Sequence, residues 1–305
     1  MGRLSRSLLL TVLVLAGTVT LRATEGGESV LAGRAASDAK EDGGGPEHGK
    51  LATADATPVD PGHFELEPSY AATIVRREWD DKRRLARDCR ARIHDLSLSL
   101  TAGVAKDVDL KAAWGFTNEF RRTPGQPSGD AEEPCHGQGL RELELGTRWR
   151  FHQMPQYGLE LAYLAGVSLP VGEHGSRNTL GICQEFWSLN QSIVVTKDWG
   201  RWTANAELGY ALPFGEKRNN ARGTFGANLA AGYQVLPWLQ PEMEINYARD
   251  FFRGKEADGD VLAATVGLVM PVHDNVRVNA GVQYGLTGQN ADRAAVFMVG
   301  VKFSW

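Results

Sequence analysis

The sequence lacks several features that mark common classes of protein. Its 33 lysines and arginines do not outnumber its 37 aspartates and glutamates, so no basic excess indicates a nucleic-acid partner. No apolar run reaches the roughly 20 residues of a membrane-spanning helix, which excludes a polytopic helical membrane protein. Only three of the 305 residues are cysteines, and none has the C-x-x-C spacing of a thiolate metal site.

Residues 1–23 have the pattern of a secretory signal peptide. Arg3 and Arg6 precede a short apolar core at residues 8–16, and Ala23 is a small residue at a suitable cleavage point. A helical membrane anchor is the alternative, but the core is short and Arg22 closes it. The pattern therefore predicts export from the cytoplasm.

Residues 24–61 are rich in glycine, alanine and acidic residues and contain no aromatic residue. Such a segment buries too little apolar area to offset the entropy lost on ordering. We therefore expect a disordered periplasmic lead-in. A role as a partner-binding tail stays open, because nothing in the segment specifies a partner.

From Gly62 onward, apolar residues occupy every second position, which is the pattern of strands with two different faces. The clearest case is Phe297, Val299, Val301 and Phe303. Twelve such segments lie near 63–75, 94–104, 108–119, 140–151, 157–169, 185–197, 201–212, 223–235, 239–250, 260–271, 276–286 and 293–305. Pro68 and Pro241 each remove a ladder donor, so bulges or local breaks are expected there.

The connections between these segments alternate between short and long. The short ones fall at 105–107, 152–156, 198–200, 236–238 and 273–275, and the long ones at 76–93, 120–139, 170–184, 213–222, 251–259 and 287–292. Up-and-down barrels of the outer membrane have this asymmetry, with tight periplasmic turns and longer external loops. A soluble sandwich has no reason to sort its loops in this way.

The two faces of the segments differ in chemistry. One face carries aliphatic and aromatic residues with almost no charge, and the other carries charged and small polar residues, as in a barrel with a polar lumen and a lipid-facing exterior. Because hydrocarbon cannot satisfy free backbone groups, only a closed barrel lets such strands span a bilayer. Aromatic residues gather at the segment ends, where two interfacial belts are expected.

A soluble all-β domain is the alternative. We predict an all-β fold, an up-and-down antiparallel transmembrane β-barrel of about twelve strands over residues 62–305, in the cell outer membrane.

Charged residues on the polar face are the candidates for lining the lumen. They are Glu144, Arg148, Arg150, Glu160, Lys197, Glu207, Glu242, Glu244 and Arg277. Rings of charge set the selectivity of pores. The alternative is that these charges pair with one another and plug the barrel, because buried ions need partners. A width of about twelve strands does not decide between the two.

Other reactive residues fall in predicted loops. Cys89, Cys135 and Cys183 lie in the first three external loops, where a disulfide could join two loops, with the pairing open. His174 and Ser176 have the His-x-Ser spacing of some outer-membrane lipid hydrolases. They lie in a glycine-rich loop, not inside a strand, which disfavours catalysis. The remaining histidines show no metal-ligand spacing, so no metal or cofactor is implied.

Four stretches of the sequence resemble a known family. They are TPVDPGHFELE at residues 57–67, LPVGE at 169–173, GYQVLPWLQPE at 232–242 and NYARDF at 246–251. Residues 57–305 resemble the family of outer-membrane transporters labelled "MetA-pathway of phenol degradation". The resemblance implies passage of aromatic or hydrophobic compounds, without assigning that role to particular residues. The chain also ends in an aromatic residue, Trp305, as barrel assembly signals do.

These observations predict a non-enzymatic barrel for passive diffusion or uptake of small solutes. External loops would gate access, and inward polar residues would tune selectivity. The expected partners are outer-membrane lipid, a small-molecule solute and, through the C-terminal strand ending at Trp305, the barrel-assembly machinery; no nucleic acid is expected. Two alternatives remain: an outer-membrane lipid or ester hydrolase, and a closed structural or ligand-binding barrel.

Overall fold

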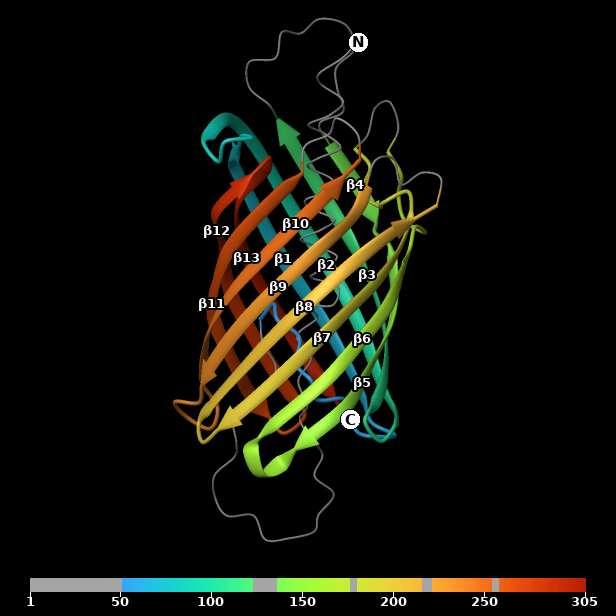
Figure 1. Cartoon of the computed structure of the whole chain (residues 1–305), viewed down its shortest axis with the longest axis vertical. Helices are drawn as coiled ribbons and strands as arrows, with labels where there is room; N and C mark the ends of the chain where they lie inside the picture. Colours follow the sequence, from blue (N-terminus) through green and yellow to red (C-terminus); the bar gives the residue numbers. More distant parts are fainter. Residues whose placement is uncertain (1–50, 123–135, 176–179, 216–220, 254–257) are drawn as a thin grey trace, which may run out of the picture.

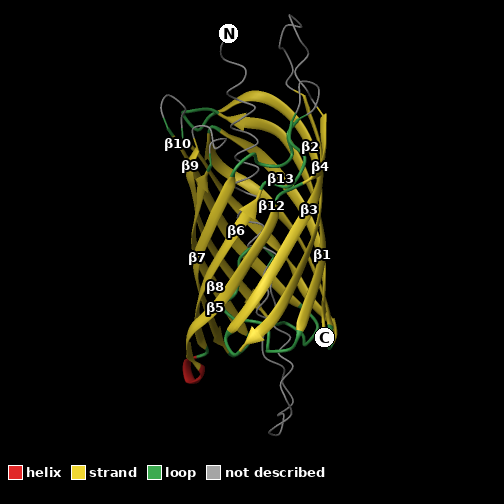
Figure 2. Ribbon diagram, turned by 90° about the vertical axis from the view of Figure 1, so that its right-hand side faces the viewer, coloured by secondary structure: helices red, strands yellow, loops and turns green. Residues whose placement is uncertain are grey.

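The computed structural model describes residues 51–122, 136–175, 180–215, 221–253 and 258–305. These residues form one antiparallel sheet that closes on itself around a lumen (Figures 1 and 2). The strands are β1 (Phe64–Trp79), β2 (Leu85–Ala105), β3 (Val108–Arg122), β4 (His136–Leu140), β5 (Leu143–Met154), β6 (Leu159–Leu169), β7 (Trp187–Trp199), β8 (Trp202–Phe214), β9 (Ala221–Tyr233), β10 (Gln240–Phe252), β11 (Gly259–His273), β12 (Val276–Gln289) and β13 (Ala291–Ser304).

Closure of the sheet depends on its first and last strands. β1 pairs with β2 on one side and with β13 on the other. β4 and β5 both pair with β3 and together occupy one strand position in the barrel wall. The result is a closed 12-stranded antiparallel barrel, which confirms the predicted fold class.

The two ends of the barrel differ in their connections. At one end the strands join through tight turns and a single 3-10 turn, Pro155–Tyr157, drawn in red at the lower end of Figure 2. We call this the periplasmic end, following the usual arrangement of such barrels, and the opposite end the outer end. Two predicted outer loops are wrong: β1 and β2 extend through most of residues 76–93, and Asn290 alone separates β12 from β13. Both errors arise because strands continue beyond the length that a bilayer requires.

The two prolines fit into their strands without the predicted bulges. Pro68 stays in register opposite Leu98 of β2, while no pair with β13 is formed at that position. Pro241 is the second residue of β10 and pairs with Leu268 of β11. The predicted local break is therefore present at Pro68 on the β13 side, whereas neither proline produces a bulge, because a missing donor removes a rung and leaves the register unchanged.

Burial is inverted relative to a soluble protein. The large side chains that are buried inside the barrel are charged or amide residues such as Arg148, Arg277 and Gln240. The large exposed side chains are apolar, and aromatic residues such as Trp149 and Trp238 lie near the strand ends. No helix among the described residues is long and apolar enough to cross a membrane. Alternation along each strand thus produces a polar interior and an apolar exterior.

A segment that precedes β1 lies inside the barrel. Residues 51–59 are buried and appear in blue within the lower half of the barrel in Figure 1. From Leu51 the segment runs towards the periplasmic end and turns into β1 at Gly62, whose amide donates to the carbonyl of Gly103. The expectation of a disordered lead-in up to Pro61 is therefore corrected for residues 51–61. Burial is possible without aromatic residues because the inner wall supplies hydrogen-bond partners in place of apolar contacts.

Candidate functional site: the occupied lumen

The upper part of the lumenal segment is bound by one glutamate of β10. The Glu244 carboxylate accepts hydrogen bonds from the amides of Leu51 (2.7 Å) and Ala52 (3.0 Å) and from the Thr53 hydroxyl (3.1 Å). Glu207 of β8 accepts from the amide of Ala54 at 3.3 Å. Charged acceptors strengthen hydrogen bonds to backbone amides, so these two wall carboxylates act as anchors for the segment.

Further anchors continue around the wall towards the periplasmic end. The amide of Ala56 donates to the Thr196 hydroxyl of β7 at 2.8 Å, and the Thr57 hydroxyl donates to Glu160 of β6 at 2.7 Å. The amide of Val59 donates to Asp109 of β3 at 3.0 Å. The segment is therefore held by strands from β10 round to β3, and its polar backbone is satisfied by wall side chains.

One arginine joins the segment to the wall by ion pairs. Arg148 of β5 is 2% exposed and bonds both to Asp109 of β3 and to Asp55 of the segment, the latter at 3.2 Å. Its guanidinium presents several donors in a fixed plane, which suits two carboxylates at once. Removing it would leave two buried acids without their cation, so Arg148 is the residue on which this contact depends most.

Close backbone approach fixes the path of the segment at both ends. A side chain at Gly103 of β2 would collide with the carbonyl oxygen of Asp60, so only glycine leaves room there. At the other end the Leu51 side chain lies over Gly267 of β11 and Gly281 of β12. Ala54 packs with Leu164 and Val194 in a small apolar cluster.

A cavity remains between Leu51 and the wall formed by β1, β2 and β3. Its volume is about 110 Å³, and small side chains form much of its lining, among them Ser69, Ala71, Ser97 and Ala113. A second space of about 50 Å³ shares two lining residues with it, Lys111 and Glu144, and continues along β3, β5 and β6. Both spaces therefore adjoin β3 and β5.

Wall charges nearer the outer end pair with each other. Arg121 of β3 bonds to Glu119 at 3.1 Å and to Asp292 of β13 at 2.9 Å, and all three are buried. The connection between β6 and β7 also folds onto the wall here: the amide of Glu173 donates to the carbonyl of Leu140.

The structure places most of the predicted lumen residues on the inner face. Glu160, Glu207, Glu242, Glu244, Arg148 and Arg277 are buried there, and Arg150 pairs with Asp107 and with Glu160. Glu144 lines both cavities. Lys197 differs, because Thr196 is the inward residue and alternation turns Lys197 outward, where its ammonium donates to the carbonyl of Tyr157. That placement corrects the prediction for Lys197.

The predicted loop chemistry is only partly within the described residues. Cys183 is a buried free thiol that donates to the carbonyl of Gln184 at 3.3 Å. Burial raises the pKa of this thiol to about 11. Cys135, the side chain of Cys89, and Ser176 lie outside the described part of the chain, so a disulfide between loops and the His174–Ser176 pair stay predictions. No group of His, Cys, Asp and Glu suited to a metal occurs among the described residues.

Sequence reasoning missed the lumenal segment itself. Its composition resembles that of a disordered region, and its residues carry no motif for burial. The signal lay in the wall: several inward acids, such as Glu207 and Glu244, have no inward cation beside them in the sequence pattern. Buried carboxylates need donors, and the amides of residues 51–54 provide them.

Comparison with known proteins gives a family and similar solved structures. The family model described as "Putative MetA-pathway of phenol degradation" matches residues 126–303. Among solved structures, the COG4313 outer membrane channel from Pseudomonas putida F1 superposes with a TM-score of 0.69 at 11% identity, covering 82% of this chain and 98% of that one. The KdgM porin gives a TM-score of 0.47 at 9% identity, covering 78% and 99% of the two chains, which is too low to support any argument. No curated protein matches the sequence.

Proposed function

Because the chain belongs to the family described as the MetA-pathway of phenol degradation, and its lumen is polar and only partly filled, we propose that it carries small solutes across the outer membrane by passive diffusion. The observation that carries this proposal is the cavity beside Leu51. It lies within the barrel, between the lumenal segment and the wall, where a solute could pass without displacing a wall strand.

The lining of this cavity supports a substrate class. Ala71, Ala113 and Met298 give it apolar patches, while charges of both signs line the rest: the acids Glu67, Asp95, Glu142 and Glu144 and the cations Lys111 and Arg141. A ring of one charge would favour ions of the opposite sign, whereas mixed charge with apolar patches suits neutral molecules that carry a hydroxyl group. The substrates we propose are therefore small neutral aromatic or hydrophobic compounds, in line with the family description.

The segment at residues 51–59 sets the size limit in this proposal. It is held by hydrogen bonds and ion pairs and by few apolar contacts, so it can leave its site without disrupting a hydrophobic core. The barrel wall would stay closed because its rungs do not depend on the segment. Movement of the segment, not of the strands, would widen the path.

A reversible disulfide tests both parts of the proposal. Ala54→Cys and Val194→Cys, in a chain whose three native cysteines are serine, join two residues of the same apolar cluster. Swelling of liposomes in solutes of graded size, and planar-bilayer conductance, are compared before and after reduction. We expect passage of small solutes in both states and passage of larger ones only after reduction.

Two controls separate the outcomes. Each single cysteine variant should behave alike with and without reductant. Equal size limits in the oxidised and reduced double variant would show that the segment does not set the size limit, while the proposal of passive diffusion would still hold. Absence of swelling and conductance in both states, with the barrel folded, would overturn the diffusion proposal in favour of a closed ligand-binding barrel.

A further inference from the structure

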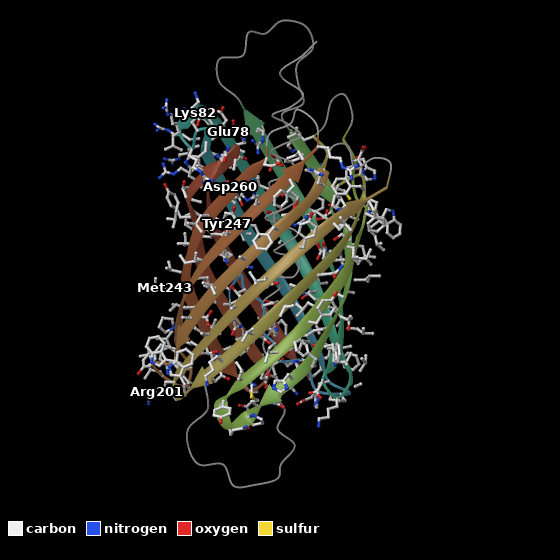
Figure 3. All side chains as sticks on the ribbon, viewed as in Figure 1. Glu78, Lys82, Arg201, Met243, Tyr247 and Asp260 are labelled. Carbon is white, nitrogen blue, oxygen red and sulfur yellow. The ribbon has the colours of Figure 1, made fainter. Side chains whose placement is uncertain are left out.

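Arginines gather on the lipid-facing side of the wall at the outer end of β13, β1 and β2. We define the outer arginine cluster as Arg76, Arg90, Arg92 and Arg293. Arg76, Arg90 and Arg92 are exposed, and Arg293 is partly buried with its guanidinium 5.0 Å from the centre of the Tyr284 ring. In Figure 3 nitrogen atoms collect at this end of the barrel, around the labelled Lys82.

The register of the sheet brings these arginines together. Arg92 lies opposite Ile74 in β1, and Arg76 follows two residues later at a bulge between β1 and both of its neighbours. Arg293 of β13 lies opposite Arg77 of β1. Since adjacent strands are about 4.8 Å apart, the cluster spans three neighbouring strands within a short distance.

Alternation places the cluster on the outside of the barrel. Thr73, Val75 and Ile93 are buried, so their neighbours Arg76 and Arg92 point away from the lumen. These side chains therefore cannot serve the lumenal pathway. They can contact only the lipid or solvent outside the barrel.

Like charges on one face are unfavourable unless an anion lies between them. Arg293 lies directly opposite Arg77 in the neighbouring strand β1. Among the described residues, no carboxylate forms an ion pair with Arg76, Arg90 or Arg92. By contrast, Arg249 at the outer end of β10 pairs with Asp258 at 3.2 Å.

The cluster lies at the height of the membrane surface. Phe64 marks the periplasmic interface, where its ring stacks on that of Trp305. A spanning strand of about ten residues starting there ends near Ile74, so Arg76 falls at the outer interface. Ile74 and Phe120 lie directly opposite Arg92 in the two neighbouring strands, and the Arg293 guanidinium lies over the Tyr284 ring; all three apolar side chains are exposed on the same face. Cations therefore adjoin an apolar surface, as an amphiphile with an anionic headgroup requires.

From this arrangement we propose that the outer arginine cluster binds the phosphate groups of lipopolysaccharide in the outer leaflet. The guanidinium groups donate to phosphate oxygens, and the acyl chains lie on Ile74, Phe120 and Tyr284. A free anion in solution could bind the arginines but would make no use of the apolar side chains beside them. The inference is independent of transport, because no member of the cluster faces the lumen.

Binding of purified lipid A to the full chain in detergent tests this proposal, with native mass spectrometry and the shift in melting temperature as readouts. The probes are bis-phosphorylated lipid A, its dephosphorylated form and inorganic phosphate. The test variant is Arg76→Gln, Arg90→Gln and Arg92→Gln combined. The control is Arg222→Gln, since Arg222 is exposed at the outer end of β9, and four strands lie between β9 and β1.

We expect the triple variant to lose about a hundredfold in affinity for bis-phosphorylated lipid A, since each cation near an anionic lipid surface contributes about a factor of five. The control should bind as the unmodified chain does. Equal binding of the dephosphorylated lipid, or an equal effect of inorganic phosphate, would overturn the proposal. So would undiminished binding by the triple variant. Heat-modifiable migration on gels, which reports a closed barrel, shows that each variant is folded.

Discussion

The periplasmic and outer halves of the lumen contain the same kinds of inward charge but arrange them differently. In the periplasmic half, Lys302 pairs with Glu65 across two wall strands, but other wall acids such as Glu244 bond to the backbone of the lumenal segment. In the outer half, acids such as Asp292 pair with Arg121 of the wall. Bonds to the segment hold a separate piece of chain, whereas pairs within the wall join one strand to another.

This contrast shows that an inward charge does not define a role by itself. A carboxylate that pairs within the wall stiffens the barrel and leaves the lumen open. A carboxylate that accepts from backbone amides retains a segment that fills part of the lumen. Four predictions test the difference, from the largest expected effect to the smallest.

Arg148→Ala should cause the largest loss of stability, because it leaves Asp55 and Asp109 buried without their shared cation. Removing one partner of a buried ion pair costs about 3–5 kcal/mol. Urea unfolding in lipid vesicles measures the change. A loss below that of an exposed pair would mean that water enters this part of the lumen and screens the acids.

Glu244→Ala should release the upper part of the lumenal segment while the barrel stays closed. The variant loses three charge-assisted hydrogen bonds, each worth roughly 1.5–3 kcal/mol before water replaces it. We expect single-channel conductance to rise several-fold. Thr265→Val is the control, since Thr265 is buried on the inner face and bonds to Asn246 but not to the segment. Unchanged conductance in Glu244→Ala would show that the remaining hydrogen bonds are enough to hold the lumenal segment in place.

Cys183 should resist alkylation in the folded protein at neutral pH, because burial raises the pKa of its thiol from 9.0 to about 11. The raised pKa stabilises the fold fully below pH 9, and that contribution is lost as the pH rises towards 11. Iodoacetamide labelling of a variant with Cys89→Ser and Cys135→Ser, followed against pH, measures this. Rapid labelling at pH 8 would contradict burial of the thiol at the outer end.

Arg83→Ala should have the smallest effect. Arg83 pairs with Asp260 at 2.6 Å; the Arg83 side chain is 47% exposed while that of Asp260 is 5% exposed, so solvent screens the pair from one side only. We therefore expect a loss of stability smaller than that of Arg148→Ala, where all three charges are buried. Measuring the free energy of unfolding of this variant and of Arg148→Ala compares the two halves of the lumen directly. Similar losses in the two variants would contradict the difference proposed between the halves.

Much of the wall could be predicted from the sequence, because period-two alternation reports directly which residues face lipid. Arg148, Glu207 and Arg277 were assigned to the lumen for that reason. Lys197 was misplaced because the alternation near the end of β7 was counted one residue out of phase. A shift of one residue exchanges the two faces of a strand.

The lumenal segment could not be predicted in this way. Residues 51–59 have no period, no aromatic residue and no regular secondary structure, so propensity and pattern both describe a free chain. Their burial depends on Glu244, Glu160 and Asp109, which lie between 50 and 193 residues away in sequence. Contacts of that kind form only in the closed barrel, and the local sequence of the segment contains no pattern that indicates them.

The seam between β1 and β13 has a consequence for the order of assembly. It joins Glu65 to Ser304 and Trp79 to Ala291, and Phe64 and Trp305 exchange hydrogen bonds at its end. Pairings so distant in sequence form late, because the entropy cost of closing a long loop comes before the favourable free energy of the contacts. Until the last strand arrives, β1 is an open edge and the segment attached to it has no enclosed lumen to occupy. The barrel therefore encloses a lumen only once its final strand has paired with β1.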